Sequence, residues 1–268
     1  MIDIKNLTYT YANNTTALKD VSLTIHKGEL ITILGQNGSG KTTLVKHLNG
    51  LLKPTSGTVL IDGTDTAQTT IAKLSKKIAY VFQNPNHQIF SDTVFNEIAF
   101  TLKRRNIDSE IIDQKVNQVM VDLNITHIKD THPMFINHAE KQMVAIASYL
   151  VVDPEVFIFD EPTSSLDYFD SELMSHLIDD LLNKGKTIIV ISHDMNFAVK
   201  HPSRIIVMHE SEMLFDGTAR DLFNKEDVFI KTALEYPQIK ALIKPFNKIP
   251  KDIFTTKELV SFLLKGDV

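Results

Sequence analysis

Cysteine is absent from the 268 residues of this chain. Its absence excludes disulfides and thiolate metal sites, and it fits a reducing compartment. Long apolar runs are also missing: the longest, such as KTIIVIS at 186–192, is far short of the roughly 20 residues that span a bilayer. The first residues, MIDIKNLTYTY, lack the basic and apolar regions of a signal peptide. We therefore expect any membrane role to be peripheral.

An excess of positive charge is missing as well. The formal net charge is −5, so no chain-wide basic field points to nucleic acid, and we expect no nucleic-acid partner. The ten histidines are scattered without the spacing of metal ligands. Apolar residues make up 43%, which is enough for a soluble domain with a packed core.

The order of apolar patterns predicts an α/β fold with a parallel-sheet core. Strands are expected within 2–34 and at 58–63, 78–82, 155–161 and 186–192, with short strands near 204–208 and 213–215. Helices are expected at 42–51 and near 70–76. From about 92 to 150 the signals are helical with no clear strand. This predicts a parallel core interrupted by a helical insertion.

The chain is expected to end in a small helical tail. We predict one domain at 1–219 and a C-terminal helical extension at 220–268. Thr255 and Glu258 have the spacing of a capping box at the start of its last helix. The tail is either a packing element or a dimerisation or docking module, and the sequence leaves both open.

A phosphate-binding loop is predicted between a buried strand and a helix, with the pattern G-x-x-x-x-G-K-[ST]. Its glycines let backbone amides surround phosphate oxygens, and the helix start adds a positive dipole end. Lys41 should reach the β- and γ-phosphates, and the Thr42 hydroxyl should bind Mg²⁺. The candidate ATP-binding residues are Gly35, Gln36, Asn37, Gly38, Ser39, Gly40, Lys41, Thr42 and Thr43.

Two carboxylates follow the apolar run of 156–159, where a buried parallel strand should reach its ligand-binding edge. Asp160 is placed to hold Mg²⁺ through water, and Glu161 to act as general base on an attacking water. His193 follows the next strand and could contact a γ-phosphate or orient the water. An acidic strand end alone is a weak signal, but beside a phosphate loop it becomes specific.

Together these motifs resemble the ATPase subunits of ABC transporters over about residues 2–217. The resemblance implies the P-loop NTPase fold of an ABC ATPase, with an N-terminal antiparallel β part. It implies that Gln83 senses Mg²⁺ and nucleotide, that His193 is the switch histidine, and that Ser165, Leu166 and Asp167 belong to the D-loop. Tyr11 matches the aromatic position that stacks on adenine, although it could equally be an ordinary strand residue.

A narrower resemblance points to the energy-coupling factor (ECF) group. The stretch FQNPNHQIFSDTVFNEIAF at 82–100 and the tail segments LEYPQIKALIKPF and TTKELVSFL are similar to that group. The resemblance implies an ATPase with ATP and Mg²⁺ as cofactors, peripheral on the cytoplasmic face of the cell membrane. It implies a second ATPase subunit, a transmembrane T component and a substrate-binding S component, driving uptake of a vitamin or metal ion.

One segment departs from the family pattern. At 136–140 the chain reads INHAE where the family carries LSGGQ or LSGGE, which closes over ATP held by the partner subunit. Asn137 can still cap the helix. His138 and Ala139 add a Cβ where backbone approaches phosphate, and if that needs a positive φ each costs roughly 1–2 kcal/mol. Glu140 is common in the group and changes little.

Three interpretations of INHAE stay open. It is a degenerate half-site in an asymmetric pair, which favours a paralogous partner over a second copy; a divergent but active signature; or a sequence that is altered or drifting towards inactivity. Two other functions also remain: the ATPase of another ABC importer class, or a non-transport regulatory ABC protein with weak hydrolysis. The intact Glu161 speaks against a purely regulatory subunit, and the chain lacks the sustained heptads of chromosome-maintenance ATPases.

Overall fold

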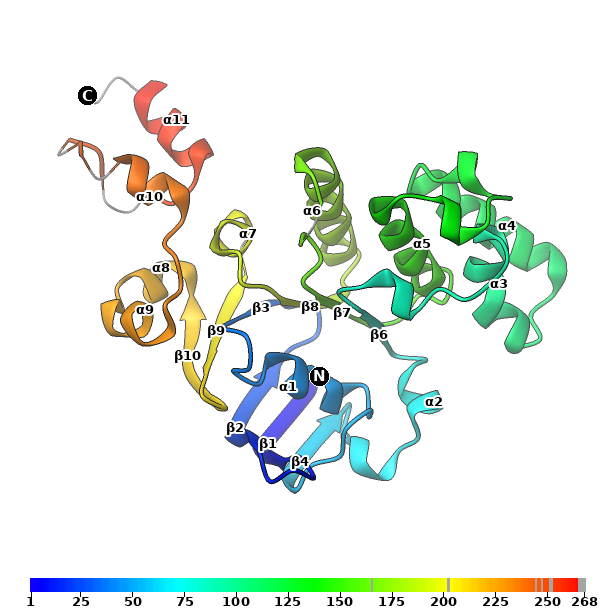
Figure 1. Ribbon diagram of the computed structural model, residues 1–268, viewed down its shortest axis with the longest axis horizontal. Coiled ribbons are helices and arrows are strands. Elements are labelled where there is room, and N and C mark those ends of the chain that lie inside the picture. The colour runs from blue at the N-terminus through cyan, green and yellow to red at the C-terminus, as the bar shows by residue number, and fades with distance from the viewer. Residues whose placement is uncertain (165, 202, 244, 247, 251–252, 265–268) are drawn as a thin grey trace. The chain divides into compact units, whose positions relative to one another are not determined.

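The computed structural model describes residues 1–164, 166–201, 203–243, 245–246, 248–250 and 253–264. The chain divides into two compact units, one formed by Met1–Thr69 with Ile189–Val268 and the other by Thr70–Ile188. Figure 1 labels their helices and strands.

The first unit begins with an antiparallel sheet of strand order β2-β1-β4-β5. The apolar residues Ile2, Ile4 and Leu7 of β1 are buried whereas Lys5 and Asn6 are exposed, as expected for a sheet with one face in the core. Ile2 pairs with Ile25 of β2 and with Ile61 of β4. The predicted N-terminal antiparallel β part is therefore present. Its strands are β1 (Ile2–Thr10), β2 (Thr16–Ile25), β4 (Ser56–Ile61) and β5 (Thr64–Asp65), followed by the 3₁₀ turn η1 (Thr66–Gln68).

The same unit also contains a mixed sheet. Strand β3 (Leu30–Leu34) is buried at all five residues and runs parallel to β9 (Arg204–His209). Strand β10 (Glu212–Thr218) pairs antiparallel with β9. Strand β8 (Thr187–Ile191) runs through the boundary between the units, and just after it the Ser192 N–H donates to the Ile33 carbonyl at 3.1 Å. Helices α1 (Lys41–Leu48) and α7 (Met195–Lys200) follow β3 and β8.

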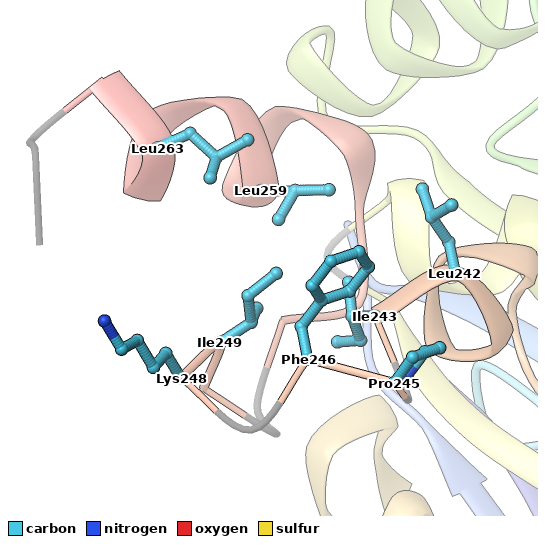
Figure 2. A pocket seen from close by; sticks show the side chains of 8 residues that line it. All are labelled: Leu242, Ile243, Pro245, Phe246, Lys248, Ile249, Leu259 and Leu263. Carbon is cyan, nitrogen blue, oxygen red and sulfur yellow. The ribbon is translucent and has the colours of Figure 1, made fainter. Parts of the chain in front are cut away.

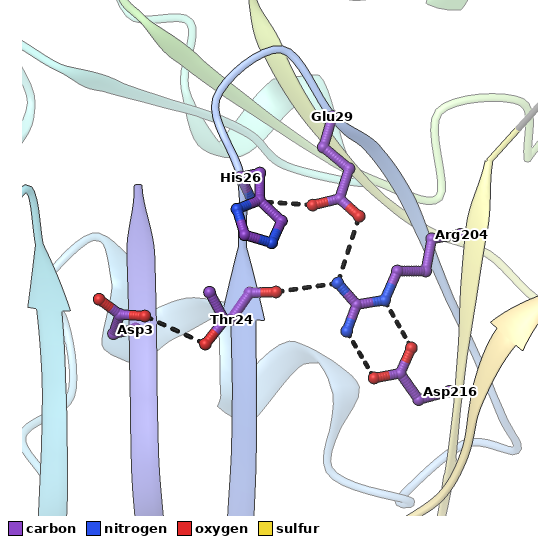
Figure 3. Close-up of polar contacts among 6 residues, drawn as sticks. All are labelled: Asp3, Thr24, His26, Glu29, Arg204 and Asp216. Atoms are coloured by element: carbon purple, nitrogen blue, oxygen red, sulfur yellow. Dashed lines mark hydrogen bonds and ion pairs between the residues drawn. The ribbon is translucent and has the colours of Figure 1, made fainter.

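Arg204 ties several strands of the first unit together (Figure 3). Its guanidinium binds both carboxylate oxygens of Asp216 on β10 at 2.5 Å. It also donates to Glu29 at 3.2 Å and to the Thr24 carbonyl of β2 at 2.9 Å. These bonds, led by that to Asp216, raise the pKa of Arg204 above its usual range. A single side chain thus connects β2, β9, β10 and the turn before β3.

The second unit pairs β6 (Ile78–Val81) parallel with β7 (Val156–Asp160), and all nine of their residues are buried. Between them in sequence lie the three longer helices of the expected insertion. Continuous apolar strands of this kind are typical of a parallel sheet covered on both faces. The helices of this unit are α2 (Ile71–Leu74), α3 (Val94–Arg104), α4 (Ser109–Asp122), α5 (His138–Leu150) and α6 (Tyr168–Asn183), with 3₁₀ turns η2 (Pro85–His87), η3 (Thr126–Ile128) and η4 (Pro133–Phe135).

The C-terminal helices pack around two separate apolar clusters. Helices α8 (Ala219–Phe223) and α9 (Glu226–Thr232) bury Leu222 and Val228 in a cluster with Leu34 of β3. Helices α10 (Gln238–Ile243) and α11 (Thr256–Leu264) form a second cluster around Ile239 and Leu259. Within the extension expected from residue 220, α8 and α9 therefore pack into one apolar cluster and α10 and α11 into another.

The capping box predicted for the last helix is present. The Glu258 N–H donates to the Thr255 hydroxyl at 3.1 Å, and the Glu258 carboxylate accepts from the Thr255 N–H at 3.0 Å. Lys240 of α10 stands over the ring of Phe254 at 4.2 Å, and that ring stacks on Phe223 of α8 at 4.2 Å. Aromatic and cation contacts therefore join α10 and the segment before α11 to α8.

Candidate functional site

The predicted phosphate loop, residues 35–42, links β3 to α1 in the first unit. Gly35 has φ +146, and a Cβ there would lie 2.2 Å from the Met208 carbonyl oxygen. Gly40 has φ +107, and a Cβ would lie 2.5 Å from the Ala17 carbonyl oxygen. These two positions accept glycine alone. The loop is thus drawn tightly between β2 and β9 while its centre, Gln36 to Gly38, is exposed.

Lys41 is buried and its amine lies inside the loop. The Nζ atom donates to the Gly35 carbonyl at 2.7 Å and to the Gln36 carbonyl at 2.9 Å. Ser39 Oγ is also buried, and it has no hydrogen-bond partner among the described residues. A loop with a buried ammonium and an orphaned hydroxyl offers donors to an anion with several oxygens. A triphosphate fits this donor set.

Tyr11 stands at the end of β1, and its hydroxyl is 3.0 Å from the Thr43 hydroxyl on α1. Its ring packs edge-on against Tyr9 at 4.9 Å and is 37% exposed. Tyr9 in turn packs against His47, whose Nδ1 contacts the Thr43 carbonyl at 2.8 Å. Burial lowers the pKa of His47, which favours the neutral form of the ring. The Tyr11 ring is therefore anchored on the phosphate-loop helix and exposed enough to stack on a base.

His193 belongs to the first unit and lies two residues after β8. Its side chain is exposed. The following Asp194 caps α7, because its carboxylate accepts the Asn196 N–H at 2.8 Å. The structure thus places His193 in the strand-to-helix turn, as the sequence predicted.

The acidic pair lies at the end of β7 in the second unit. Asp160 is the last residue of the strand, and Glu161 follows with φ +53. A non-glycine residue in this left-handed region costs of order 1–3 kcal/mol and is held there by its surroundings. The Glu161 carbonyl accepts the Ser164 N–H at 3.2 Å and the Ser164 hydroxyl at 2.9 Å. This tight turn fixes the direction in which the Glu161 side chain leaves the strand.

Sequence reasoning missed two side chains that contact this pair or its turn. The Tyr80 hydroxyl donates to Asp160 Oδ2 at 2.7 Å, and burial, reinforced by the Asp160 charge, raises the pKa of Tyr80. Gln142 of α5 is buried and donates to the Pro162 carbonyl at 2.6 Å. The contact of Tyr80 could have been suspected from a tyrosine next to the last residue of β6. No sequence signal indicated the second.

Gln83 is exposed and lies in the segment that follows β6. Gln88 closes this segment, because its Oε1 accepts the Phe82 N–H at 3.1 Å and its Nε2 donates to the Tyr80 carbonyl at 3.2 Å. Within the turn, Asn84 caps η2. The segment carrying Gln83 is thus a closed loop beside the end of β6.

The INHAE segment forms the start of α5. Asn137 is the N-cap, and Asn137 and Glu140 make a reciprocal capping box with bonds of 2.9 and 2.8 Å. His138 and Ala139 are the first helical residues, and neither has a positive φ. The strain that a positive φ would impose therefore does not arise here. What these residues add is side-chain volume at the helix start.

Negative charge gathers near this helix start. Glu140 contacts His127 at 3.2 Å. Asp167 caps α6 by accepting the Asp170 N–H at 2.9 Å. Desolvation, together with the charges of Asp167 and Glu140, raises the pKa of Asp170. Three carboxylates therefore lie near one another in this unit. Of the predicted D-loop, Leu166 and Asp167 are described and residue 165 lies outside the described residues.

The structure thus brings Tyr11, the phosphate loop and His193 into the first unit. Gln83, Asp160, Glu161, Asp167 and the INHAE segment belong to the second. The part of the chain that the structure describes contains no group of three His, Cys, Asp or Glu side chains placed to hold a metal. Mg²⁺ takes few protein ligands and completes its shell with water and phosphate, and the Thr42 hydroxyl in the first unit and the Asp160 carboxylate in the second are each oxygen donors of the kind that it binds.

Comparisons of the sequence and of the structure with known proteins find similarity to the same family. A family model described as ABC transporter matches residues 18–164. The energy-coupling factor transporter ATP-binding protein EcfA2 of Clostridium tetani is 37% identical over 278 residues, covering 98% of this chain and 96% of that protein. A putative ABC transporter ATP-binding protein of Caldanaerobacter subterraneus subsp. tengcongensis is 38% identical over 97% of this chain. The chain spans 45% of that protein's length.

Solved structures give the same fold. CbiO1 from Clostridium perfringens, described as part of the ABC transporter complex CbiONQ, has a TM-score of 0.77 and 34% identity, covering 91% of this chain and 98% of that one. A dimeric ATP-binding cassette in a post-hydrolysis state, bound to ADP and Pi, has a TM-score of 0.75 and 31% identity, covering 82% and 99%. The α/β fold predicted from the sequence is confirmed.

Proposed function

Because this chain belongs to the ABC transporter ATP-binding family, and to its energy-coupling factor group, we propose that it hydrolyses ATP to drive an importer of a vitamin or a metal ion. The observation that carries the proposal is the glycine loop at 35–42 with the Lys41 amine folded into it. Such a loop at a helix start is built for phosphate oxygens. The near full-length similarity to ECF ATP-binding proteins supports the transport role.

Each predicted site residue has a role in the proposed hydrolysis. Lys41 and the loop amides would hold the β- and γ-phosphates, and the exposed Tyr11 ring would stack on adenine. Glu161 would accept the proton of the attacking water, and His193 would orient that water against the γ-phosphate. Gln83 would report nucleotide binding to the membrane partner. The supporting observation for Glu161 is its buried turn with φ +53, which sets its direction.

Mg²⁺ fits the oxygen donors described above. Thr42 and Asp160 would hold it, with Gln83 as a further ligand through its side-chain oxygen. When bound, the ion neutralises the charge that develops on the transferred phosphoryl group. Tyr80 supports the assignment, since its hydroxyl already holds one oxygen of the buried Asp160.

We further propose that the INHAE half-site is degenerate and that this chain serves in an asymmetric pair, with a paralogous ATPase favoured over a second copy. By this proposal, ATP at Gly35–Thr42 turns over when the partner brings an intact signature. ATP of the partner would face the start of α5. The His138 ring supports this, because as the first side chain of α5 it adds volume where a γ-phosphate would approach the helix start.

The C-terminal extension offers a candidate contact surface for the second ATPase. An open, mostly apolar cavity of about 550 Å³ lies between α10 and α11, with one cation among its lining residues (Figure 2). An exposed apolar surface of this kind is typical of an interaction site. The lining residues are Leu242, Ile243, Pro245, Phe246, Lys248, Ile249, Leu259 and Leu263.

A matched pair on α11 tests this surface. Leu263 lines the cavity and is 46% exposed, whereas the adjacent Leu264 is 82% exposed and lies outside it. Leu263→Glu should lose the co-purifying ATPase while ATP binding persists, and Leu264→Glu should keep both. Equal retention of the partner by the two variants would reject the assignment.

The remaining partners follow from the transport role. We propose a transmembrane T component and a substrate-binding S component, which would bring the chain to the cytoplasmic face of the cell membrane. The description of CbiO1 as part of a transporter complex supports this. Within the described residues, no helix combines the length and apolarity that a membrane crossing requires. The other candidate, a regulatory ABC protein, would purify without membrane proteins.

Phosphate release by the purified chain tests the ATPase assignment. Wild-type chain should bind ATP and release phosphate only weakly, because both half-sites of a homodimer carry INHAE, and that release should require Mg²⁺. Lys41→Ala should lose ATP binding, because the loop loses its buried ammonium. If Lys41→Ala binds ATP as tightly as wild type while remaining folded, the phosphate loop is not the nucleotide site.

A further inference from the structure

The Tyr80 hydroxyl lies on the carboxylate to which the proposed function assigns Mg²⁺. It donates to Asp160 Oδ2 at 2.7 Å, with the two residues 4% and 9% exposed. The register of the parallel strands explains the contact. Tyr80 pairs with Ile158, and Asp160 lies two residues further along β7 on the same face. The long tyrosine side chain spans this diagonal, so the contact is built into the strand pairing.

Tyr80 is itself held on several sides. Its carbonyl accepts bonds from the Tyr149 hydroxyl of α5 at 3.0 Å and from Gln88 Nε2 at 3.2 Å. Gln88 also donates to the Tyr149 hydroxyl at 2.9 Å. The Tyr80 ring packs edge-on against Phe82 with 4.5 Å between centroids. Its hydroxyl is therefore presented to Asp160 from a fixed position.

We propose that Tyr80 is a positioning residue that sets the orientation of the Asp160 carboxylate for Mg²⁺; this rests on the proposed function. A donor bound to one oxygen of a metal-binding carboxylate fixes the plane of that group and so the direction of its lone pairs. A merely structural Tyr80 would fill space and satisfy the buried carboxylate without affecting metal affinity. The two roles therefore differ in one measurable quantity.

Tyr80→Phe removes the hydroxyl and keeps the ring. We would measure Mn²⁺ binding to the chain with ADP by electron paramagnetic resonance, and the Mg²⁺ dependence of phosphate release. We expect roughly tenfold weaker metal binding, with ADP binding in EDTA unchanged. Tyr149→Phe is the matched control, because it removes a partly buried hydroxyl from the same network without touching Asp160 and leaves the Gln88 bond to the Tyr80 carbonyl. Its metal affinity should stay within about twofold of wild type.

The outcomes separate the inference from the proposed function. Wild-type chain that binds no Mn²⁺ with ADP would defeat the proposed function. Wild-type chain that binds it, with equal affinity in Tyr80→Phe, would overturn the role of Tyr80. If Tyr80→Phe does not fold, Asp160→Asn is compared with the double variant Tyr80→Phe, Asp160→Asn. The double variant should fold more readily, because a neutral amide left without the Tyr80 hydroxyl costs less to bury than a carboxylate does. Equal metal affinity supports action through Asp160, and a further loss overturns it.

Discussion

Restoring the family pattern at the start of α5 should move stability and turnover in opposite directions. The change is Asn137→Ser, His138→Gly and Ala139→Gly together. Serine caps a helix about as well as asparagine, so the bond to the Glu140 N–H should persist. His138 and Ala139 are helical without positive φ, so glycine relieves no strain there. Each glycine then costs up to about 1 kcal/mol in helix propensity, and the variant should lose about 1–2 kcal/mol of unfolding free energy.

Turnover should rise in the same variant. Without the His138 ring and the Ala139 methyl group, the first backbone amides of α5 become open to a γ-phosphate. One such donor, aimed at developing charge, is worth about 10²–10³ in rate. We expect phosphate release by a homodimer of this chain to rise at least about tenfold.

Phosphate release at increasing protein concentration and urea unfolding measure the two effects. Asn137→Ser alone is the control, and it should leave both quantities near wild type. Unchanged turnover in a folded, ATP-binding triple variant would refute the degenerate-signature interpretation and favour a divergent but active one. A triple variant more stable than wild type would refute the helical assignment of His138 and Ala139.

Three more predictions concern other sites. Glu161→Gln should bind ATP but release no phosphate, leaving a closed dimer detectable by size exclusion wherever the facing signature is competent; unaffected hydrolysis would remove Glu161 as the base. Burial lowers the pKa of His47, so the folded state resists protonation, and unfolding free energy should fall as pH drops below about 6.5. His47→Gln should lessen that fall in urea titrations at pH 7 and pH 5, and an identical pH dependence would contradict this. Arg204→Met should cost about 1–2 kcal/mol of unfolding free energy, because the partly buried bidentate pair with Asp216 is lost. Lys19→Met, which removes an exposed ion pair with Glu212, is the control and should leave stability unchanged. Equal losses in the two variants would show that the Arg204 contacts stabilise the fold no more than an exposed ion pair does.

The sequence predicted what depends on local pattern. The phosphate loop between β3 and α1, the acidic end of β7 and the Thr255–Glu258 capping box all follow from short-range rules of glycine, apolar runs and caps. The family and fold were also predicted correctly. The roles of the individual site residues remain predictions.

The contacts that the sequence did not predict join residues far apart in the chain. Tyr80 and Asp160 meet because of the parallel register of β6 and β7, which no local spacing encodes. The Arg204 network likewise depends on how β2, β9 and β10 come together. The sequence did not predict the backbone angles of individual residues either. Only the structure showed that His138 avoids a positive φ while Glu161 adopts one.

The closed segment after β6 also bears on how this chain avoids unwanted association. Strand β6 is the last strand in its sheet order, and an open strand edge is a template for pairing with another chain. Here the Gln88 amide binds the Phe82 N–H and the Tyr80 carbonyl, while Tyr149 binds that carbonyl as well. One amide side chain thus occupies positions that a foreign strand would use. The edge of β6 is thereby protected from pairing with another chain, and we expect Gln88→Ala to aggregate more readily than wild type.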